Sequence, residues 1–175
     1  MKIRNKIVVL GLVTLSLFVT ACGKVRTGST TESTTSDLEA SGEGAISLDA
    51  KSLADDIKKE GKFKDQLAEV EADIAINRLY QLDSGKLSDY CFYTNTGATA
   101  EEIAVVKVND DSYLKNIEEA FNKRVESQKE ACSDYLPDEM PKLDKAVVKT
   151  VGSYVIFVVS EDSAKAEGII DKLTN

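Results

Sequence analysis

The N-terminal segment determines how much of this chain is left to fold. Residues 1–6 carry three basic side chains and are followed by an apolar stretch, Ile7–Ala21, that ends at a cysteine. A membrane-spanning helix needs about 20 predominantly apolar residues, so this stretch is too short for one. A basic segment, a short apolar segment and small residues, in that order, predict a signal peptide over residues 1–21.

The end of this segment, Val19-Thr20-Ala21-Cys22, has the pattern of a lipobox. In that interpretation the thiol of Cys22 receives diacylglycerol, and cleavage makes Cys22 the first residue of the mature protein. Acyl chains of the palmitate type would then bind membrane lipid, because each buried CH₂ contributes about 0.8 kcal/mol. We therefore expect a cell-membrane protein, lipid-anchored on the extracytoplasmic face. A plain secretory signal with a chance cysteine, or an uncleaved anchor, are the alternatives.

Two further regions follow the signal peptide. Residues 22–45 comprise the predicted lipidated cysteine and a stretch rich in Ser, Thr and Gly that lacks hydrophobic periodicity, which indicates a disordered tether. Residues 46–175 form the predicted single globular domain. Its length of about 130 residues is enough to bury a core without disulfides.

Composition excludes several classes of function. The chain has no His, which rules out His-based triads, His zinc sites and His-ligated haem, and we expect no cofactor. Its net charge is −8, and removal of the leader makes it more negative. Phosphate backbones repel such a surface, so no nucleic-acid partner is expected. The paired acidic residues do not match a calcium-binding loop, so no metal site is expected either.

Hydrophobic patterning predicts an α+β fold. Apolar spacing and capping residues predict a helix from Asp49 to Gly61, a long helix from Ser112 to Cys132 and a terminal helix from Asp162 to Leu173. Four segments are predicted to be strands: 87–94, 102–108, 146–151 and 154–159.

The last two of these strands flank Gly152-Ser153, which predicts a hairpin with a type II′ turn. The segment 66–82 fits both helix and strand, and 138–145 fits a short helical turn. The expected architecture is a roughly four-stranded, mainly antiparallel sheet with a long central helix, a β-hairpin and flanking N- and C-terminal helices.

Few residues of the domain are candidates for a site. Arg124 lies beside the apolar stripe of the long helix, where it is suited either to a structural ion pair or to a ligand anion. Tyr135 and Tyr154 belong to a set of aromatic residues that either line a groove or pack in the core. Cys91 and Cys132 either form a disulfide or remain buried thiols.

Four groups of residues form a recognisable combination: Ala100–Val108, Arg124 with Glu126 and Gln128, Tyr135-Leu136-Pro137 and Gly152-Ser153-Tyr154-Val155. Together they resemble the bacterial lipoprotein family catalogued as domain of unknown function 4358. Glu101 stands where the family would have Asp, and Cys132 where an aromatic residue is common. The resemblance implies a lipobox, a polar tether and one domain, as found chiefly in Clostridia, and therefore the outer face of the cell membrane. It implies no catalytic residue.

From this we expect a lipid-anchored binding or interaction module of the cell envelope rather than an enzyme. Its expected partners are membrane lipid through acylated Cys22 and an envelope protein or small ligand. An envelope hydrolase is the first alternative, with Ser84 and Lys86 or Ser163 and Lys165 as its candidate pairs, because a buried Lys can act as a base. A structural or assembly factor is the second, and a large exposed apolar patch would favour it.

Overall fold

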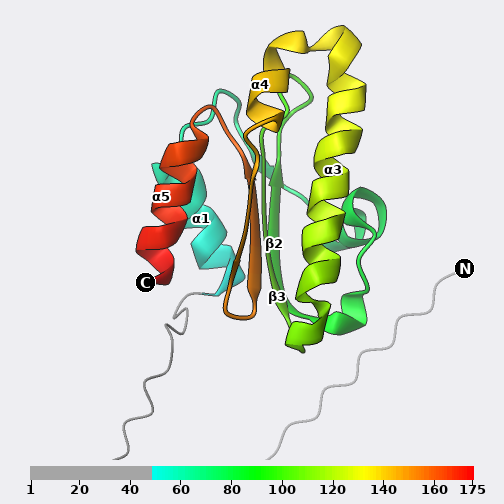
Figure 1. The fold of residues 1–175 in the computed structure, drawn as a ribbon, viewed down its shortest axis with the longest axis vertical. Coiled ribbons are helices and arrows are strands. Elements are labelled where there is room, and N and C mark those ends of the chain that lie inside the picture. The colour runs from blue at the N-terminus through cyan, green and yellow to red at the C-terminus, as the bar shows by residue number, and fades with distance from the viewer. Residues whose placement is uncertain (1–48) are drawn as a thin grey trace, which may run out of the picture. The chain divides into compact units, whose positions relative to one another are not determined.

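The computed structural model describes residues 49–175, in which helices pack on both faces of an antiparallel sheet (Figure 1). The predicted signal peptide, Cys22 and the predicted tether lie outside the described residues, as does the start of the predicted domain. The five strands are β1 (Ala68–Glu69), β2 (Leu87–Thr94), β3 (Glu102–Val108), β4 (Val147–Val151) and β5 (Tyr154–Val159), in the order β1-β2-β3-β5-β4.

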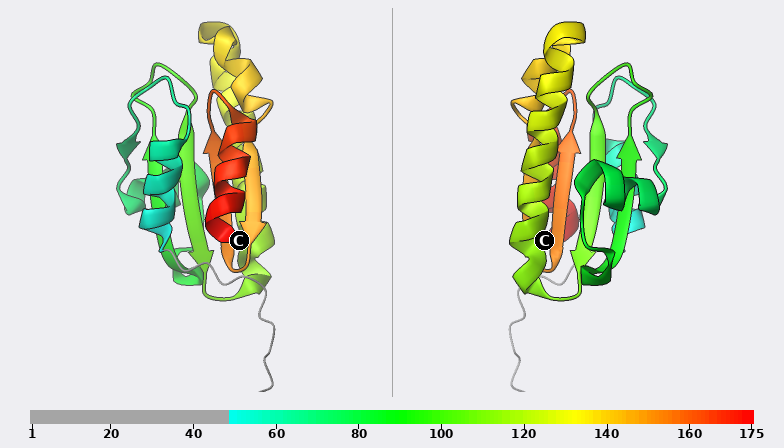
Figure 2. Two further views of the ribbon diagram at one scale, coloured as in Figure 1. Left: turned by 90° about the vertical axis from the view of Figure 1, so that its left-hand side faces the viewer. Right: turned by 90° about the vertical axis from the view of Figure 1, so that its right-hand side faces the viewer.

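The helices form two layers around this sheet. Helices α1 (Ala50–Glu60) and α5 (Ser163–Thr174) lie on one face, and α3 (Leu114–Tyr135) lies on the other (Figure 2). Shorter helical segments connect these elements: α2 (Ala72–Ile74), the π-helix η1 (Ala75–Tyr80), the 3₁₀ turns η2 (Ser84–Lys86), η3 (Asp111–Tyr113) and η4 (Pro137–Glu139), and α4 (Met140–Leu143).

The predicted α+β class with an antiparallel sheet is confirmed, but the sheet has five strands instead of about four. The extra strand is β1, in which Ala68 pairs with Thr94 and Glu69 with Tyr93. Two residues are too few to give a period-2 pattern, which explains the mixed pattern of segment 66–82. That segment contains β1, α2 and η1 in succession.

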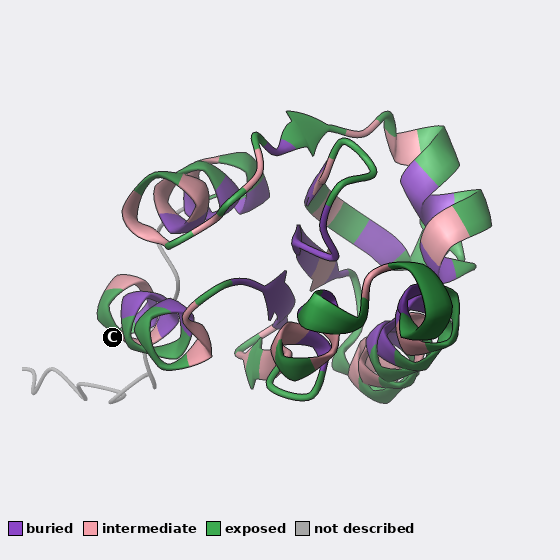
Figure 3. Ribbon diagram, turned by 90° about the horizontal axis from the view of Figure 1, so that it is seen from above, coloured by how far each residue is buried: buried purple, intermediate pink, exposed green. Residues whose placement is uncertain are grey.

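Strand β3 lies in the middle of the sheet and is covered on both faces. Val105 belongs to the hydrophobic cluster under α1 and α5, and Val106 to the cluster under α3. Both are fully buried, as the continuous apolar run of β3 predicts. In Figure 3 the buried, purple stretches follow the strands and the sheet-facing sides of the helices.

Capping residues, apolar spacing and turn residues in the sequence correctly predicted where the long helices and the hairpin lie. Asp49 caps α1, because its Oδ1 accepts a hydrogen bond of 2.7 Å from the backbone N–H of Ser52. The stripe predicted for the long helix is buried along α3, which extends to Tyr135. The β4–β5 hairpin turns at Gly152 with a φ of 54°, and Ser153 has no positive φ, which is the sign pattern of a type II′ turn.

Candidate functional site

A carboxylate lies in the core at the start of β3. Glu102 is 0% exposed, and both of its oxygens accept hydrogen bonds. From α3, Arg124 donates through Nε to Oε1 at 3.1 Å and through Nη2 to Oε2 at 2.8 Å. Gln128 donates to Oε2 at 2.8 Å, and the hydroxyl of Tyr80 at the end of η1 donates to Oε1 at 2.6 Å. We call these four residues the Glu102 network.

The Glu102 network is held together by electrostatics. A buried carboxylate is costly unless it is paired and hydrogen-bonded, and here one guanidinium and two neutral donors meet that requirement. Burial opposes the charge of Arg124, but its hydrogen bonds to Glu102 outweigh this effect and raise the pKa of Arg124. Burial and then the charge of Glu102 raise the pKa of Tyr80 well above its ordinary value. Arg124 therefore keeps its positive charge, and Tyr80 keeps its proton and remains a hydrogen-bond donor.

A hollow opens above this network, between η1 and α3. Its volume is about 130 Å³. The residues that line it, mostly from these two helices, are Arg78, Leu79, Tyr80, Gln81, Ala120, Lys123, Arg124 and Ser127. We call this hollow the basic hollow, because it is lined by three cationic side chains and by no carboxylate.

Two of the three cations in the basic hollow have no ion-pair partner in the described part of the chain. Arg78 and Lys123 are exposed, and neither forms a salt bridge within residues 49–175. Arg124 is paired with Glu102, yet its side chain is still 20% exposed. The hollow therefore gathers positive charge on a chain whose net charge is −8.

The backbone on one side of the basic hollow has an unusual conformation. Segment η1 is a π-helix of six residues, and Gln81, which follows it, has a φ of 54°. Single turns of π-helix and left-handed non-glycine residues are both uncommon and occur often at functional sites. Here they bring Arg78 and Tyr80 to the side of α3 that carries Lys123 and Arg124.

The structure does not bring the other two predicted ligand-binding residues to Arg124. Tyr135 is 87% exposed at the far end of α3. Tyr154 is buried in the hydrophobic cluster on the opposite face of the sheet, where its ring lies 5.1 Å from the ammonium of Lys107. Of the three, only Arg124 lines a hollow together with other charged groups.

Cys91 and Cys132 are free, buried thiols. Cys91 belongs to the cluster under α1 and α5, and Cys132 to the cluster under α3, so the sheet separates them. Burial raises the pKa of Cys91 to about 11, which keeps it a neutral apolar group at pH 7. The disulfide alternative for these residues does not fit this arrangement.

A second charged cluster lies beside the Glu102 network. The ammonium of Lys142 in α4 is 3.1 Å from Glu101, 2.9 Å from Glu139 and 2.9 Å from Glu161. We call these four residues the Lys142 cluster. Glu101 is 0% exposed and also accepts hydrogen bonds from the backbone N–H groups of Lys64 and Asp65. The cluster ties α4 to one end of the sheet, because Glu101 precedes the start of β3, Glu161 follows the end of β5, and these two strand ends pair.

The roles of these acidic residues were not predicted from the sequence. One signal is present: Glu101 directly precedes β3 and Glu102 is its first residue, and the strand is apolar on both faces. Charges in such a position have to be paired, although the sequence does not indicate by which residues.

The two Ser/Lys pairs considered for hydrolysis lie at the surface. Ser84 and Lys86 are both exposed in η2, and Lys165 is exposed on α5 next to half-buried Ser163. Within residues 49–175 no group of three acidic or cysteine side chains is arranged to hold a metal ion. In the same range, none of the helices combines the length and apolarity needed to cross a bilayer.

Fold and site together define an α+β domain with a five-stranded antiparallel sheet. The buried Glu102 network joins this sheet to α3 and lies beneath the basic hollow. Residues 59–160, more than half of the chain, match the family model described as domain of unknown function (DUF4358). The chain belongs to this family. Three residues from the segments that carried the resemblance, Glu102, Arg124 and Gln128, meet in the Glu102 network. No curated protein and no solved structure matches the chain.

Proposed function

We propose that the protein is an extracytoplasmic binding module, anchored by acyl chains on Cys22, whose domain binds an anionic group in the basic hollow. The observation that carries the binding step is the placement of Arg78 and Lys123, which form no salt bridge within residues 49–175, around Arg124. The anchoring step rests on the lipobox pattern of the sequence.

The geometry suits a small anion better than a large ligand. The hollow of about 130 Å³ has room for a phosphate or a carboxylate group. The Nε and Nη2 atoms of Arg124 are engaged by Glu102, so this guanidinium is held in place before a ligand arrives. Such preorganisation lowers the entropic cost of binding. Arg78 and Lys123 supply the charge that Glu102 does not neutralise.

A hydrolase is less well supported by the described residues. A lysine general base needs burial or a neighbouring cation to lower its pKa, whereas Lys86 and Lys165 are exposed. The assembly-factor alternative calls for a large apolar surface patch, and the large exposed apolar side chains within residues 49–175 are only Ile74, Tyr90 and Tyr135.

Titration of the full chain with inorganic phosphate and with citrate tests the basic hollow. We expect binding by calorimetry, weakened about tenfold or more by the double substitution of Arg78→Gln with Lys123→Gln, since charge-assisted hydrogen bonds contribute about 1.5–3 kcal/mol. Lys115→Gln is the matched control, because Lys115 is exposed on α3, forms no salt bridge among the described residues and does not line the hollow. Equal weakening by Lys115→Gln, or no binding of either anion by the wild-type chain, would contradict the proposal.

Substitution of Cys22 tests the anchor. Cys22→Ala removes the thiol that would carry the acyl chains, so the protein is expected to move from the membrane fraction to uncleaved or soluble forms and to lose palmitate labelling. Cys132→Ala is the control and should keep the label, because Cys132 is a buried thiol of the domain. Mass spectrometry of the wild-type N-terminus showing an unmodified Cys22, or the leader still attached, would overturn this step.

A further inference from the structure

One edge of the sheet is only partly covered. Strand β1 pairs with Tyr93 and Thr94, and the N–H of Val70 then donates to the carbonyl oxygen of Phe92 at 2.9 Å. After Glu71 the chain leaves the edge and enters α2. Leu87 and residues 89–91 of β2 pair with β3 on one side, with a shift of register at Ser88, and among residues 49–175 no strand lies on their other side.

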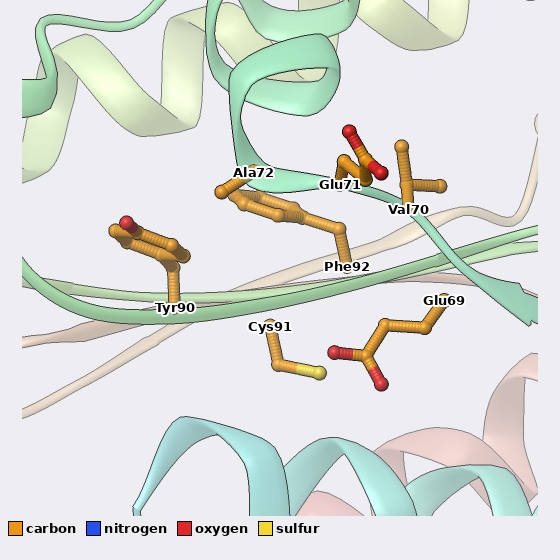
Figure 4. Close-up of a pocket in the computed structure, with 7 residues that line it drawn as sticks. All are labelled: Glu69, Val70, Glu71, Ala72, Tyr90, Cys91 and Phe92. Atoms are coloured by element: carbon orange, nitrogen blue, oxygen red, sulfur yellow. The ribbon is translucent and has the colours of Figure 1, made fainter. Parts of the chain in front are cut away.

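A pocket of about 330 Å³ lies at this edge, and its lining comes from both faces of the sheet. Figure 4 shows Tyr90, Phe92 and Ala72 on one side of the β2 ribbon, and Cys91 and Glu69 on the other. The side chains of a β-strand point alternately to the two faces of its sheet. A pocket that extends around the edge of β2 therefore has the shape that an additional strand would fill.

We propose that this open edge of β2 binds an extended peptide segment of a partner protein, added to the sheet in line with β1, with alternating aliphatic and basic side chains. Strand addition of this kind gains affinity from backbone hydrogen bonds and specificity from pockets for alternate side chains. This docking edge is separate from the basic hollow, and the proposal does not depend on the proposed function.

The aliphatic half of the pattern follows from the α2 side of the pocket. Tyr90 is 39% exposed, and its ring stacks on Phe92 with centroids 5.7 Å apart. Together with Val70 and Ala72 these rings form an apolar wall. An aliphatic side chain of the added strand would cover Tyr90, one of the few large apolar side chains left exposed in the described part of the chain.

The basic half follows from the carboxylates at the docking edge. Glu69 and Glu71 both line the pocket. Glu71 forms no salt bridge within residues 49–175, and Glu69 has only a 3.4 Å contact with exposed Lys51. Figure 4 shows Glu69 on the Cys91 side of β2, opposite the apolar wall, so Lys or Arg side chains on that face of the peptide would pair with Glu69. Glu71 and the chain's net charge of −8 would add to the attraction and speed the encounter.

When no peptide is bound, the carboxylate of Asp89 protects the edge of β2 from unspecific pairing with other strands. Its Oδ1 accepts a hydrogen bond from the N–H of Tyr90 at 2.9 Å, and its Oδ2 accepts one from the N–H of Ala50 at 2.7 Å. A charge at an exposed edge is a common protection against unspecific strand pairing. The same carboxylate would favour a basic peptide over a neutral one.

The test uses the full chain in a zwitterionic detergent and a fluorescent eight-residue peptide that alternates valine and lysine. We expect binding by anisotropy, together with slower amide hydrogen exchange confined to residues 88–92. Alternate amides of an added strand point toward the sheet. N-methylation of one alternate set of peptide amides should therefore weaken binding at least tenfold, and methylation of the other set should leave it within twofold. Equal binding of both methylated peptides would show charge attraction alone and overturn the proposal.

A protein variant tests the docking edge independently. Tyr90→Lys replaces the apolar wall with a like charge and is expected to weaken binding at least tenfold, with amide protection in β3 showing that the sheet is intact. Tyr135→Lys, at an aromatic residue that is 87% exposed away from this pocket, is the matched control and should bind as the wild type does. Loss of binding in both variants contradicts the proposal. So does protection of residues 88–92 that rises with protein concentration without peptide, because a second copy would then occupy the edge.

Discussion

Replacing Arg124 with methionine is expected to lower the free energy of unfolding by about 3–5 kcal/mol at neutral pH, because it leaves the buried charge of Glu102 without its cation. Tyr80 and Gln128 still donate to Glu102 in this variant, but neither carries a charge. The chain has no Trp, so urea unfolding is best followed by far-UV circular dichroism.

Two further variants separate the buried ion pair from a general effect of charge. Lys123→Met removes the neighbouring cation, which is exposed and forms no salt bridge among the described residues, and should change the stability by less than about 0.5 kcal/mol. The double variant Glu102→Leu with Arg124→Met should regain much of the loss, since removing both charges of a buried pair is often close to neutral. If Arg124→Met alone lowers the free energy of unfolding by less than about 1 kcal/mol, the ion pair with Arg124 is not required to stabilise buried Glu102.

Lys142→Met is expected to have the second large effect, a loss of about 3 kcal/mol at pH 7, because the buried carboxylates of Glu101 and Glu139 then have no cation among the described residues. The third carboxylate, Glu161, keeps only its 4.0 Å contact with exposed Lys62. Glu101 and Glu139 are buried, so water cannot take over the role of the ammonium. Lys145→Met is the matched control, because Lys145 is exposed nearby and forms no salt bridge among residues 49–175.

The pH dependence of this loss has a defined sign. Burial opposes the charge of Lys142, but hydrogen bonds to Glu161, Glu139 and Glu101 outweigh it and raise the pKa of Lys142. Its contribution to stability is therefore present below the ordinary lysine pKa of 10.5 and is lost only as the pH rises through the raised value. The hydrogen bond from Lys142 lowers the pKa of Glu161, so that contribution is present above 4.5 and is lost as the pH falls through the lowered value.

Lowering the pH should therefore reduce the difference in the free energy of unfolding between the wild type and Lys142→Met. The wild type loses the contribution of the Lys142–Glu161 pair as Glu161 is protonated, whereas the variant has no such pair to lose. Urea unfolding of both proteins at neutral pH and in a series of buffers well below pH 4.5 measures this. A difference that stays constant across this range would contradict the electrostatic explanation.

The helices and strands with strong local signals could be predicted from the sequence alone. Asp49 caps α1 as predicted, α5 begins directly after Asp162, where the terminal helix was predicted to start, and Gly152 turns the hairpin. Strand β1 and the π-helix η1 were not predicted, because a two-residue strand has no period and a π-helix differs from an α-helix only in its hydrogen bonds.

Much less of the candidate site could be predicted. Arg124 stands out in the sequence because it lies beside the apolar stripe of α3, but that position does not distinguish a structural ion pair from the binding of a ligand anion. Its partner Glu102 lies 22 residues earlier in the chain, and Tyr80 lies 22 residues before Glu102. Such contacts depend on which strand lies under which helix, and local periodicity does not contain that information. The same holds for Lys142, which meets Glu101 across 41 positions.

The central position of β3 also affects how the chain reaches its native state. Ala104 pairs with Phe92 on one side and with Phe157 on the other, so the second pairing joins residues about fifty positions apart. The whole of α3 lies in the loop that this pairing closes. Rates of folding fall as native contacts become more distant along the chain, because the entropy of closing long loops is lost before the contacts form. This topology therefore places the domain among the slower-folding small proteins, with β2 and β3 exposed to other chains until β5 arrives.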